Sequence, residues 1–150
     1  MPTMLSRKMG DNSFIITAEL APPRGSDTSG FLRMAAFVAP HVDAINVTDN
    51  QGANMRMTPL TAAALLVRSG IEPIMQLTCR DRNRLALQSD LLGAAAMGIN
   101  NILALTGDHI TCGDHGQGRA VFDLDSVLLI RMIQGLGTAA PIRLSMILSL

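Results

Sequence analysis

Short apolar runs alternate along the chain with segments whose apolar residues recur at helical spacing. Residues 14–20, 43–48, 72–78 and 101–106 are compact apolar runs bounded by Pro, Gly, Asn or Asp, which is typical of buried strands. The apolar residues of 31–38, 59–69, 81–97 and 126–135 instead follow the spacing of amphipathic helices. Residues 142–150 predict the start of a fifth strand. The pattern therefore predicts about four βα units followed by part of a fifth.

Polar caps and glycine stops predict where the helices begin and end. Asp, Ser and Thr side chains accept hydrogen bonds from the free N–H groups of a first helical turn, and glycine commonly follows a last turn. The expected caps are, in chain order, Asp27 or Ser29, Thr58 before Pro59, Asp81, and Asp123 or Asp125. The expected stops are Gly70, Gly98, Gly135 and Gly137.

Four βα units without a hairpin signal predict an α/β fold with a parallel sheet. Two architectures fit, an open doubly wound sheet and part of a (β/α)₈ TIM barrel. The first βα turn reads Ala21-Pro22-Pro23-Arg24-Gly25 and lacks the glycine fingerprint of dinucleotide-binding sheets, which favours the barrel. A complete barrel takes about 250 residues. We therefore expect residues 1–150 to form a single, truncated barrel domain.

Composition narrows the choice of partners. Hydrophobic residues make up 48% of the chain, enough to fill a core, and 12 basic residues balance 12 acidic ones without forming a basic stripe. Nucleic acid is therefore not an expected partner. No apolar run approaches the roughly 20 residues that a bilayer requires, and no signal segment is evident, so we expect a cytoplasmic protein with no membrane partner. Cys79 and Cys112 are expected to be reduced thiols.

Polar side chains collect where the predicted strands end. Glu19 ends the first strand, Thr48 the second and Gln76 lies near the end of the third, while Thr106-Gly107-Asp108 follow the fourth. Because loops at the carboxyl ends of parallel strands converge on one face, these side chains are expected to share a rim. Glu19 is a lone carboxylate among apolar neighbours, which favours a functional role over a purely structural pairing, for example with Arg24.

One segment contains several possible metal ligands. His109, Cys112, Asp114 and His115 lie within seven residues, and all are ligand types that zinc accepts. Their spacing matches no closed zinc motif, and glycines surround them. We therefore predict no metal site.

Four segments resemble the methylenetetrahydrofolate reductase family in order and spacing. They read TAELAPPRG at 17–25, NVTDNQGAN at 46–54, QLTCRDRN at 76–83 and NILALTGD at 101–108, and VFDLDS at 121–126 extends the likeness, which covers roughly residues 14–137. The third and fourth segments look closest to reductases of acetogens and to reductases fused to homocysteine methyltransferases. The resemblance implies a (β/α)₈ barrel that uses FAD to reduce 5,10-methylenetetrahydrofolate to 5-methyltetrahydrofolate in one-carbon and methionine metabolism.

The resemblance also implies roles for particular residues. Glu19 takes the position of the acid that protonates N10 of the folate, and Asp108 that of the carboxylate that stabilises the iminium ion. Cofactor-binding positions fall on Thr48, Ala53, Gln76, Thr106, Gly107 and Asp108. Gln76 stands where the enteric type has a flavin-contacting His, and Thr106 stands in place of an Arg, so those contacts are expected to differ.

The resemblance leaves the later strands of the barrel unaccounted for. In the family, those strands carry much of the FAD contact and a glutamine that binds folate. The resemblance also implies NAD(P)H or another electron donor as the reductant. Three hypotheses follow: an oxidoreductase completed by self-association or by a complementing barrel half, an inactive fragment, and a non-enzymatic interaction subunit.

Overall fold

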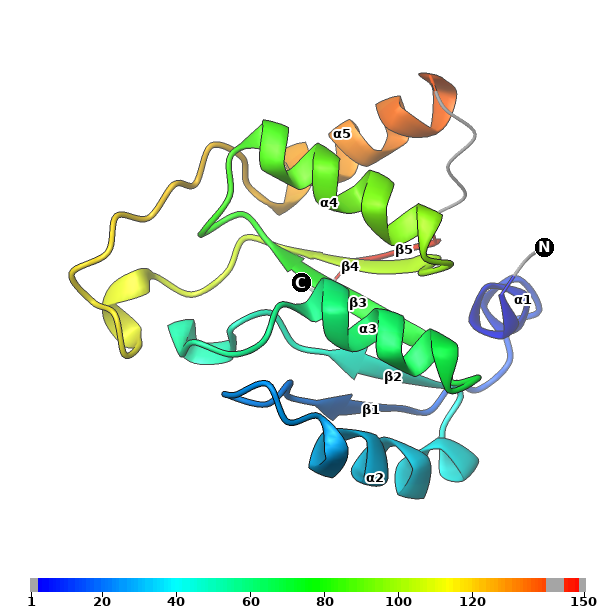
Figure 1. Ribbon diagram of the computed structural model, residues 1–150. Coiled ribbons are helices and arrows are strands. Elements are labelled where there is room, and N and C mark those ends of the chain that lie inside the picture. The colour runs from blue at the N-terminus through cyan, green and yellow to red at the C-terminus, as the bar shows by residue number, and fades with distance from the viewer. Residues whose placement is uncertain (1–2, 140–144, 149–150) are drawn as a thin grey trace.

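Five parallel strands form one sheet in the order in which they occur along the chain (Figure 1). The computed structural model describes residues 3–139 and 145–148. The helices are α1 (Met4–Gly10), α2 (Ser29–Val38), α3 (Pro59–Arg68), α4 (Arg84–Ala96) and α5 (Ser126–Ala139), with short 3-10 turns η1 (Ala39–His41), η2 (Gln51–Ala53) and η3 (Ile110–Cys112). The strands are β1 (Thr17–Leu20), β2 (Ala44–Val47), β3 (Pro73–Thr78), β4 (Asn101–Leu105) and β5 (Ser145–Leu148). The predicted α/β class with a parallel sheet is confirmed.

Helices α2 to α5 pack on one face of the sheet because every second strand residue is apolar there. Val47, Met75 and Ile102 point into this layer and are 0% exposed. They pack with the apolar sides of the four helices, for example with Leu66 of α3 and Leu91 of α4. Burial of each large aliphatic side chain contributes about 1.5–3 kcal/mol. This layer therefore holds the strands in place and fixes which of their side chains face the other way.

The opposite face carries the polar residues of the strands. The register aligns Glu19 of β1 with Asn46 of β2, and Gln76 of β3 with Leu103 of β4. Because side chains alternate along a strand, these residues lie on the face away from α2 to α5. Glu19 and Gln76, which the sequence places near strand ends, thus share one face.

Most helix boundaries follow the predicted signals, but several details differ, and the Thr58 side chain precedes α3 without making a cap hydrogen bond. Pro59 opens α3, and Gly70 and Gly98, with φ of 73° and 80°, follow α3 and α4 in the left-handed conformation that glycine favours. Gly135 and Gly137, however, do not end α5, which runs to Ala139. Asp81 does not cap α4 either.

The residue that caps α4 is Asn83. Its side chain accepts a hydrogen bond from the N–H of Ala86, and Asp123 accepts one from the N–H of Arg84 at 2.9 Å. Asp81 is instead paired with Arg80. The carboxylate of Asp125 accepts from the N–H of Leu128 at 2.7 Å, which confirms it as a cap of α5. Asp123 therefore caps a different helix from the one predicted.

The N-terminal part of the chain differs most from the prediction. The first strand begins at Thr17 rather than at residue 14, and the Phe14 side chain is 85% exposed. The unpredicted helix α1 lies at the end of the sheet where the strands begin (Figure 1). Glu72 accepts hydrogen bonds from the N–H groups of Met4 and Leu5, and Leu5 packs against Ala44. Across the described residues, no helix combines the length and apolar character needed to span a bilayer.

Candidate active site

A cleft of about 470 Å³ opens where the strands end. Four of the residues predicted from the sequence line it, namely Glu19, Gln76, Gly107 and Asp108. The other lining residues are Asp49, Gln51, Thr78, Arg80, Leu103 and Leu105. The cleft is mainly polar, with a small apolar wall from Leu103 and Leu105 of β4, so it suits a ligand that combines hydrogen-bonding groups with some apolar surface.

Glu19 points into this cleft and is held by two amides. Gln76 Nε2 donates to one carboxylate oxygen at 3.0 Å, and Gln51 Nε2 donates to the other at 3.1 Å. Arg24 is not its partner, since its guanidinium contacts Asp114 and Asn54, each at 3.4 Å. The structural alternative of a Glu19–Arg24 pair is therefore wrong.

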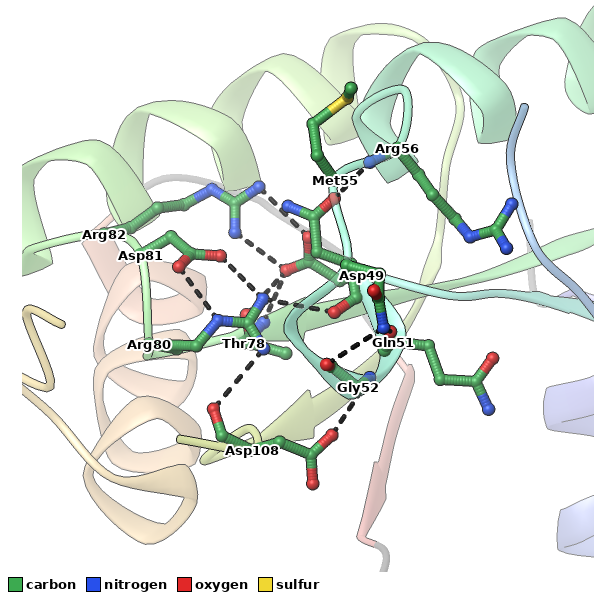
Figure 2. Close-up of polar contacts among 12 residues, drawn as sticks. Asp49, Gln51, Gly52, Met55, Arg56, Thr78, Arg80, Asp81, Arg82 and Asp108 are labelled. Carbon is green, nitrogen blue, oxygen red and sulfur yellow. Dashed lines mark hydrogen bonds and ion pairs between the residues drawn. The ribbon is translucent and has the colours of Figure 1, made fainter. Parts of the chain in front are cut away.

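Asp108 lies across the cleft from Glu19, on the loop that follows β4. Its carboxylate accepts a hydrogen bond from the N–H of Gly52 at 3.1 Å (Figure 2). Gly107 places it there with a φ of 94°, and a Cβ at Gly107 would lie 3.0 Å from the Cβ of Thr78. The position therefore favours glycine for both its conformation and its close packing.

The remaining predicted cofactor-binding residues do not line the cleft. Thr48 is 0% exposed, and its hydroxyl has no hydrogen-bond partner among the described residues. Ala53 is buried in η2 with a φ of 57°. The Thr106 hydroxyl accepts from the N–H of Ser126 at 3.1 Å and so helps to start α5. The structure thus brings together four of the seven predicted residues at the cleft and places these three around it.

A buried ion-pair network supports the floor of the site. Asp49 is 2% exposed and accepts hydrogen bonds from the backbone and hydroxyl of Thr78, at 2.8 and 2.9 Å, and from Arg82 at 2.7 Å. Arg82 also pairs with Asp90 of α4 at 3.0 Å. Burial lowers the pKa of Arg82, but the charge of Asp49, its hydrogen bond to Arg82 and the charges of Asp90 and Asp81 together outweigh burial, so the net shift is upward. The network ties the ends of β2 and β3 to α4.

A second pair, between Arg80 and Asp81, holds the loops above that floor. The Arg80 guanidinium is 2% exposed and donates to both oxygens of Asp81, at 2.9 and 2.7 Å (Figure 2). It also donates to the carbonyls of Asn50 and Asp108, at 3.3 and 3.4 Å. Hydrogen bonding to Asp81 raises the pKa of Arg80. Burial by itself would raise the pKa of the Asp81 carboxyl, but the hydrogen bonds and the positive charges around it, chiefly those of Arg80, lower it by more, so the net shift is downward. One arginine thus joins the loops after β2, β3 and β4.

The segment with possible metal ligands serves instead to dock a loop. Asp114 accepts hydrogen bonds from the N–H of Met55 at 3.0 and 3.2 Å, and the His109 ring contacts the Thr111 hydroxyl at 2.9 Å. Within residues 3–137, whose side chains are described, no group of three or more His, Cys, Asp or Glu side chains is arranged to hold a metal ion. Cys79 is buried and Cys112 exposed, and both thiols are free.

A family model for methylenetetrahydrofolate reductase matches residues 4–144. The chain belongs to the methylenetetrahydrofolate reductase family. The comparison with curated proteins gives no match. Membership of the methylenetetrahydrofolate reductase family indicates an oxidoreductase that acts on a folate, in a family that is generally flavin-dependent.

Three further residues organise this candidate site, and sequence reasoning gave none of them a role. Arg80 stands in the charged run Arg80-Asp81-Arg82, which is typical of a solvated surface, yet its side chain is buried. Asp49 and Gln51 act through contacts with Thr78 and Glu19, which lie 29 and 32 residues away along the chain. The one available signal was the excess of polar residues directly after strands that are otherwise apolar.

Proposed function

We propose that this chain takes part in the flavin-dependent reduction of 5,10-methylenetetrahydrofolate to 5-methyltetrahydrofolate. The observation that carries the proposal is that Glu19 and Asp108 open on one cleft at the carboxyl ends of the strands, in a chain of the methylenetetrahydrofolate reductase family. Ends of parallel strands are where (β/α)₈ enzymes carry out their chemistry.

Glu19 is the proposed general acid. Opening of the five-membered ring breaks the bond between the bridging carbon and N10 and leaves an iminium ion at N5, so N10 must receive a proton. Glu19 carries the only ionisable side chain on β1 and presents it to the cleft. Gln51 and Gln76 fix the direction of its carboxyl group, and a positioned acid accelerates such a step by about 10²–10⁴-fold.

Asp108 is the proposed stabiliser of the cation. The iminium ion carries a positive charge that the folate lacked before ring opening. A carboxylate held beforehand in a cleft stabilises that developing charge without having to reorganise. The hydrogen bond from Gly52 and the restricted backbone at Gly107 hold the Asp108 side chain at the cleft.

The residues around the cleft fit a flavin. Gln76 offers an amide to a ring edge, Leu103 and Leu105 offer an apolar surface, and the buried Thr48 hydroxyl has a hydrogen-bonding capacity that the described residues leave unused. Thr48, Ala53, Gln76, Thr106, Gly107 and Asp108 are the proposed FAD-binding positions. When bound and reduced by NAD(P)H or another donor, the flavin would supply the hydride that turns the bridging carbon into a methyl group.

The proposal includes a closed barrel. Parallel strands in chain order with α2 to α5 on one face are the arrangement of consecutive units of a (β/α)₈ barrel. The further strands are proposed to come from additional polypeptide, whether a complementing half or a second copy of this chain. Their loops would cover the cleft and exclude water, which strengthens the electrostatic contribution of Asp108.

Spectroscopy and rapid kinetics test this proposal. The chain, together with the polypeptide that completes its barrel, is purified with added FAD and is expected to show the absorbance of bound flavin. In anaerobic stopped-flow mixing, Glu19→Gln should slow flavin oxidation by the folate at least 100-fold and leave flavin reduction by the electron donor nearly unchanged, because only the first requires a proton at N10. Equal losses in both half-reactions would make Glu19 a structural or flavin-binding residue. Absence of both flavin binding and turnover would favour a non-enzymatic interaction subunit.

A further inference from the structure

The turn after β2 has an unusual backbone that the surrounding loops hold in place. Asn50, Gly52 and Ala53 have φ values of 46°, 64° and 57°, all in the left-handed region. For residues other than glycine this conformation costs about 1–2 kcal/mol each, so it persists where neighbouring contacts impose it.

Contacts on two sides impose this conformation. From the inside, Arg80 donates to the Asn50 carbonyl at 3.3 Å. From the outside, the loop after β4 packs so closely that a Cβ at Gly113 would lie 1.7 Å from the Ala53 carbonyl oxygen. The Asn50 side chain closes the turn itself by accepting from the N–H of Arg56 at 2.8 Å. The turn is therefore a rigid part of the cleft wall.

Two consecutive residues of this turn reach the two proposed acidic groups. Gln51 donates its side-chain amide to Glu19 at 3.1 Å, and Gly52 donates its backbone N–H to Asp108 at 3.1 Å. Glu19 lies on β1 and Asp108 follows β4, so the turn spans the cleft between the first and fourth strands. Figure 2 shows Gly52 directed at Asp108, with the Gln51 side chain extending away from the buried Arg80–Asp81 pair.

We propose that Gln51 is a positioning residue, and that the Gln51–Gly52 turn sets the orientation of Glu19 relative to Asp108. The kinetic effect of this orientation rests on the proposed function, in which Glu19 as the acid and Asp108 as the cation stabiliser must face the same folate. Gln76 holds the second oxygen of Glu19 from the floor of the sheet. Without Gln51, one Glu19 oxygen loses its partner and the carboxyl group can turn about the remaining contact. Since the Gln51 side chain is exposed, its replacement leaves the core intact.

The first experiment needs neither ligand nor turnover. In ¹⁵N–¹H NMR spectra of the 150-residue chain, Glu19→Gln should shift the side-chain amide signals of Gln51. Asp108→Asn should shift the backbone amide of Gly52 and, through the turn, the same Gln51 side-chain signals. Gln134, exposed on α5, is the matched control whose signals should not move. Gln51 signals that ignore both substitutions, or that match those of an unfolded chain, would overturn the proposal.

The second experiment is a double-mutant cycle on the folate half-reaction. Gln51→Ala and the isosteric Gln51→Glu should each slow it about tenfold, the lower end expected for loss of a hydrogen bond to a charged group. Flavin reduction by the donor, and the half-reactions of Gln134→Ala, should stay at the original rates. In the Glu19→Gln background, Gln51→Ala should add no further loss, because Gln51 acts through Glu19.

The outcomes separate the positioning role from the proposed function. Full activity of both Gln51 variants, or the same tenfold loss with and without Glu19, would overturn the positioning role while the reductase function stands. A chain without folate turnover would overturn the proposed function, and the NMR result would then decide whether the turn couples the two carboxylates.

Discussion

Gly107→Ala should destabilise the fold although it adds only one methyl group. The φ of Gly107 is 94°, and the new Cβ would meet the Thr78 Cβ at 3.0 Å, the Thr78 Cγ2 at 3.3 Å and the Arg80 Cβ at 3.4 Å. The left-handed conformation costs a residue with a Cβ about 1–2 kcal/mol. Crowding against the end of β3, which cannot move without disturbing the sheet, adds about 1–3 kcal/mol. We therefore expect the free energy of unfolding to fall by about 2–5 kcal/mol.

Urea unfolding followed by circular dichroism measures this change. With a denaturant slope of about 2 kcal/mol per molar, the midpoint should fall by roughly 1–2.5 M. The matched control is Gly135→Ala in α5, where a Cβ meets nothing within 4 Å and the backbone is helical. That variant should be as stable as the original chain or up to about 1 kcal/mol more stable. A Gly107→Ala midpoint equal to or above the original would refute both the conformation and the close packing assigned to Gly107.

Three further predictions concern charge and thiol chemistry. Asp108→Asn should slow the folate half-reaction more than tenfold, because a neutral amide cannot offset the iminium charge; unchanged stopped-flow rates would remove Asp108 from the mechanism. The side-chain hydrogen bond from Arg84 lowers the pKa of Asp123 from 3.8 to about 2, so the stability it provides is present above pH 3.8 and is lost as the pH falls through 2. Urea midpoints of Asp123→Asn should consequently fall less between pH 5 and pH 2 than those of the original chain, and parallel curves would contradict the pairing. Burial, with lesser effects of nearby acidic groups, raises the pKa of the Cys79 thiol to about 11. At pH 8 a thiol reagent should therefore modify the exposed Cys112 and react with Cys79 only on unfolding. Fast labelling of both cysteines, measured by mass spectrometry, would refute the burial of Cys79.

Local patterns sufficed to predict the parts of the fold whose stability is decided locally. The apolar run of β3 and the Thr58-Pro59 start of α3 each carry a signal within a few residues, and both appear where expected. Glu19 was singled out because an unpartnered carboxylate in an apolar strand is costly to bury, yet the structure leaves it exposed at the cleft and pairs it with Gln51 and Gln76. These predictions required no knowledge of which distant segments meet.

The predictions that failed depend on such distant contacts. Helix α1 has only 7 residues, too few to be stable alone, and is held by Glu72 from more than 60 residues away. Asp81 has the sequence context of a helix cap, but the neighbouring buried arginine pairs with it and Asn83 caps the helix instead. The contact of Gln51 with Glu19 arises only after β1 and β2 pair. A single sequence does not display any of these three relationships.

Because side chains alternate along the six residues of β3, selection for stability and selection for ligand binding act on different positions of the same strand. Met75 and Leu77 face the helices and belong to the core, whereas Gln76 and Thr78 face the cleft and line the candidate site. In a saturation-mutagenesis map, Met75 and Leu77 should therefore report abundance of the folded protein, whereas Gln76 should report specific activity at normal abundance. Evolution can consequently change the ligand contacts of this strand while its packing stays constant, because neighbouring residues along the strand lie on opposite faces of the sheet.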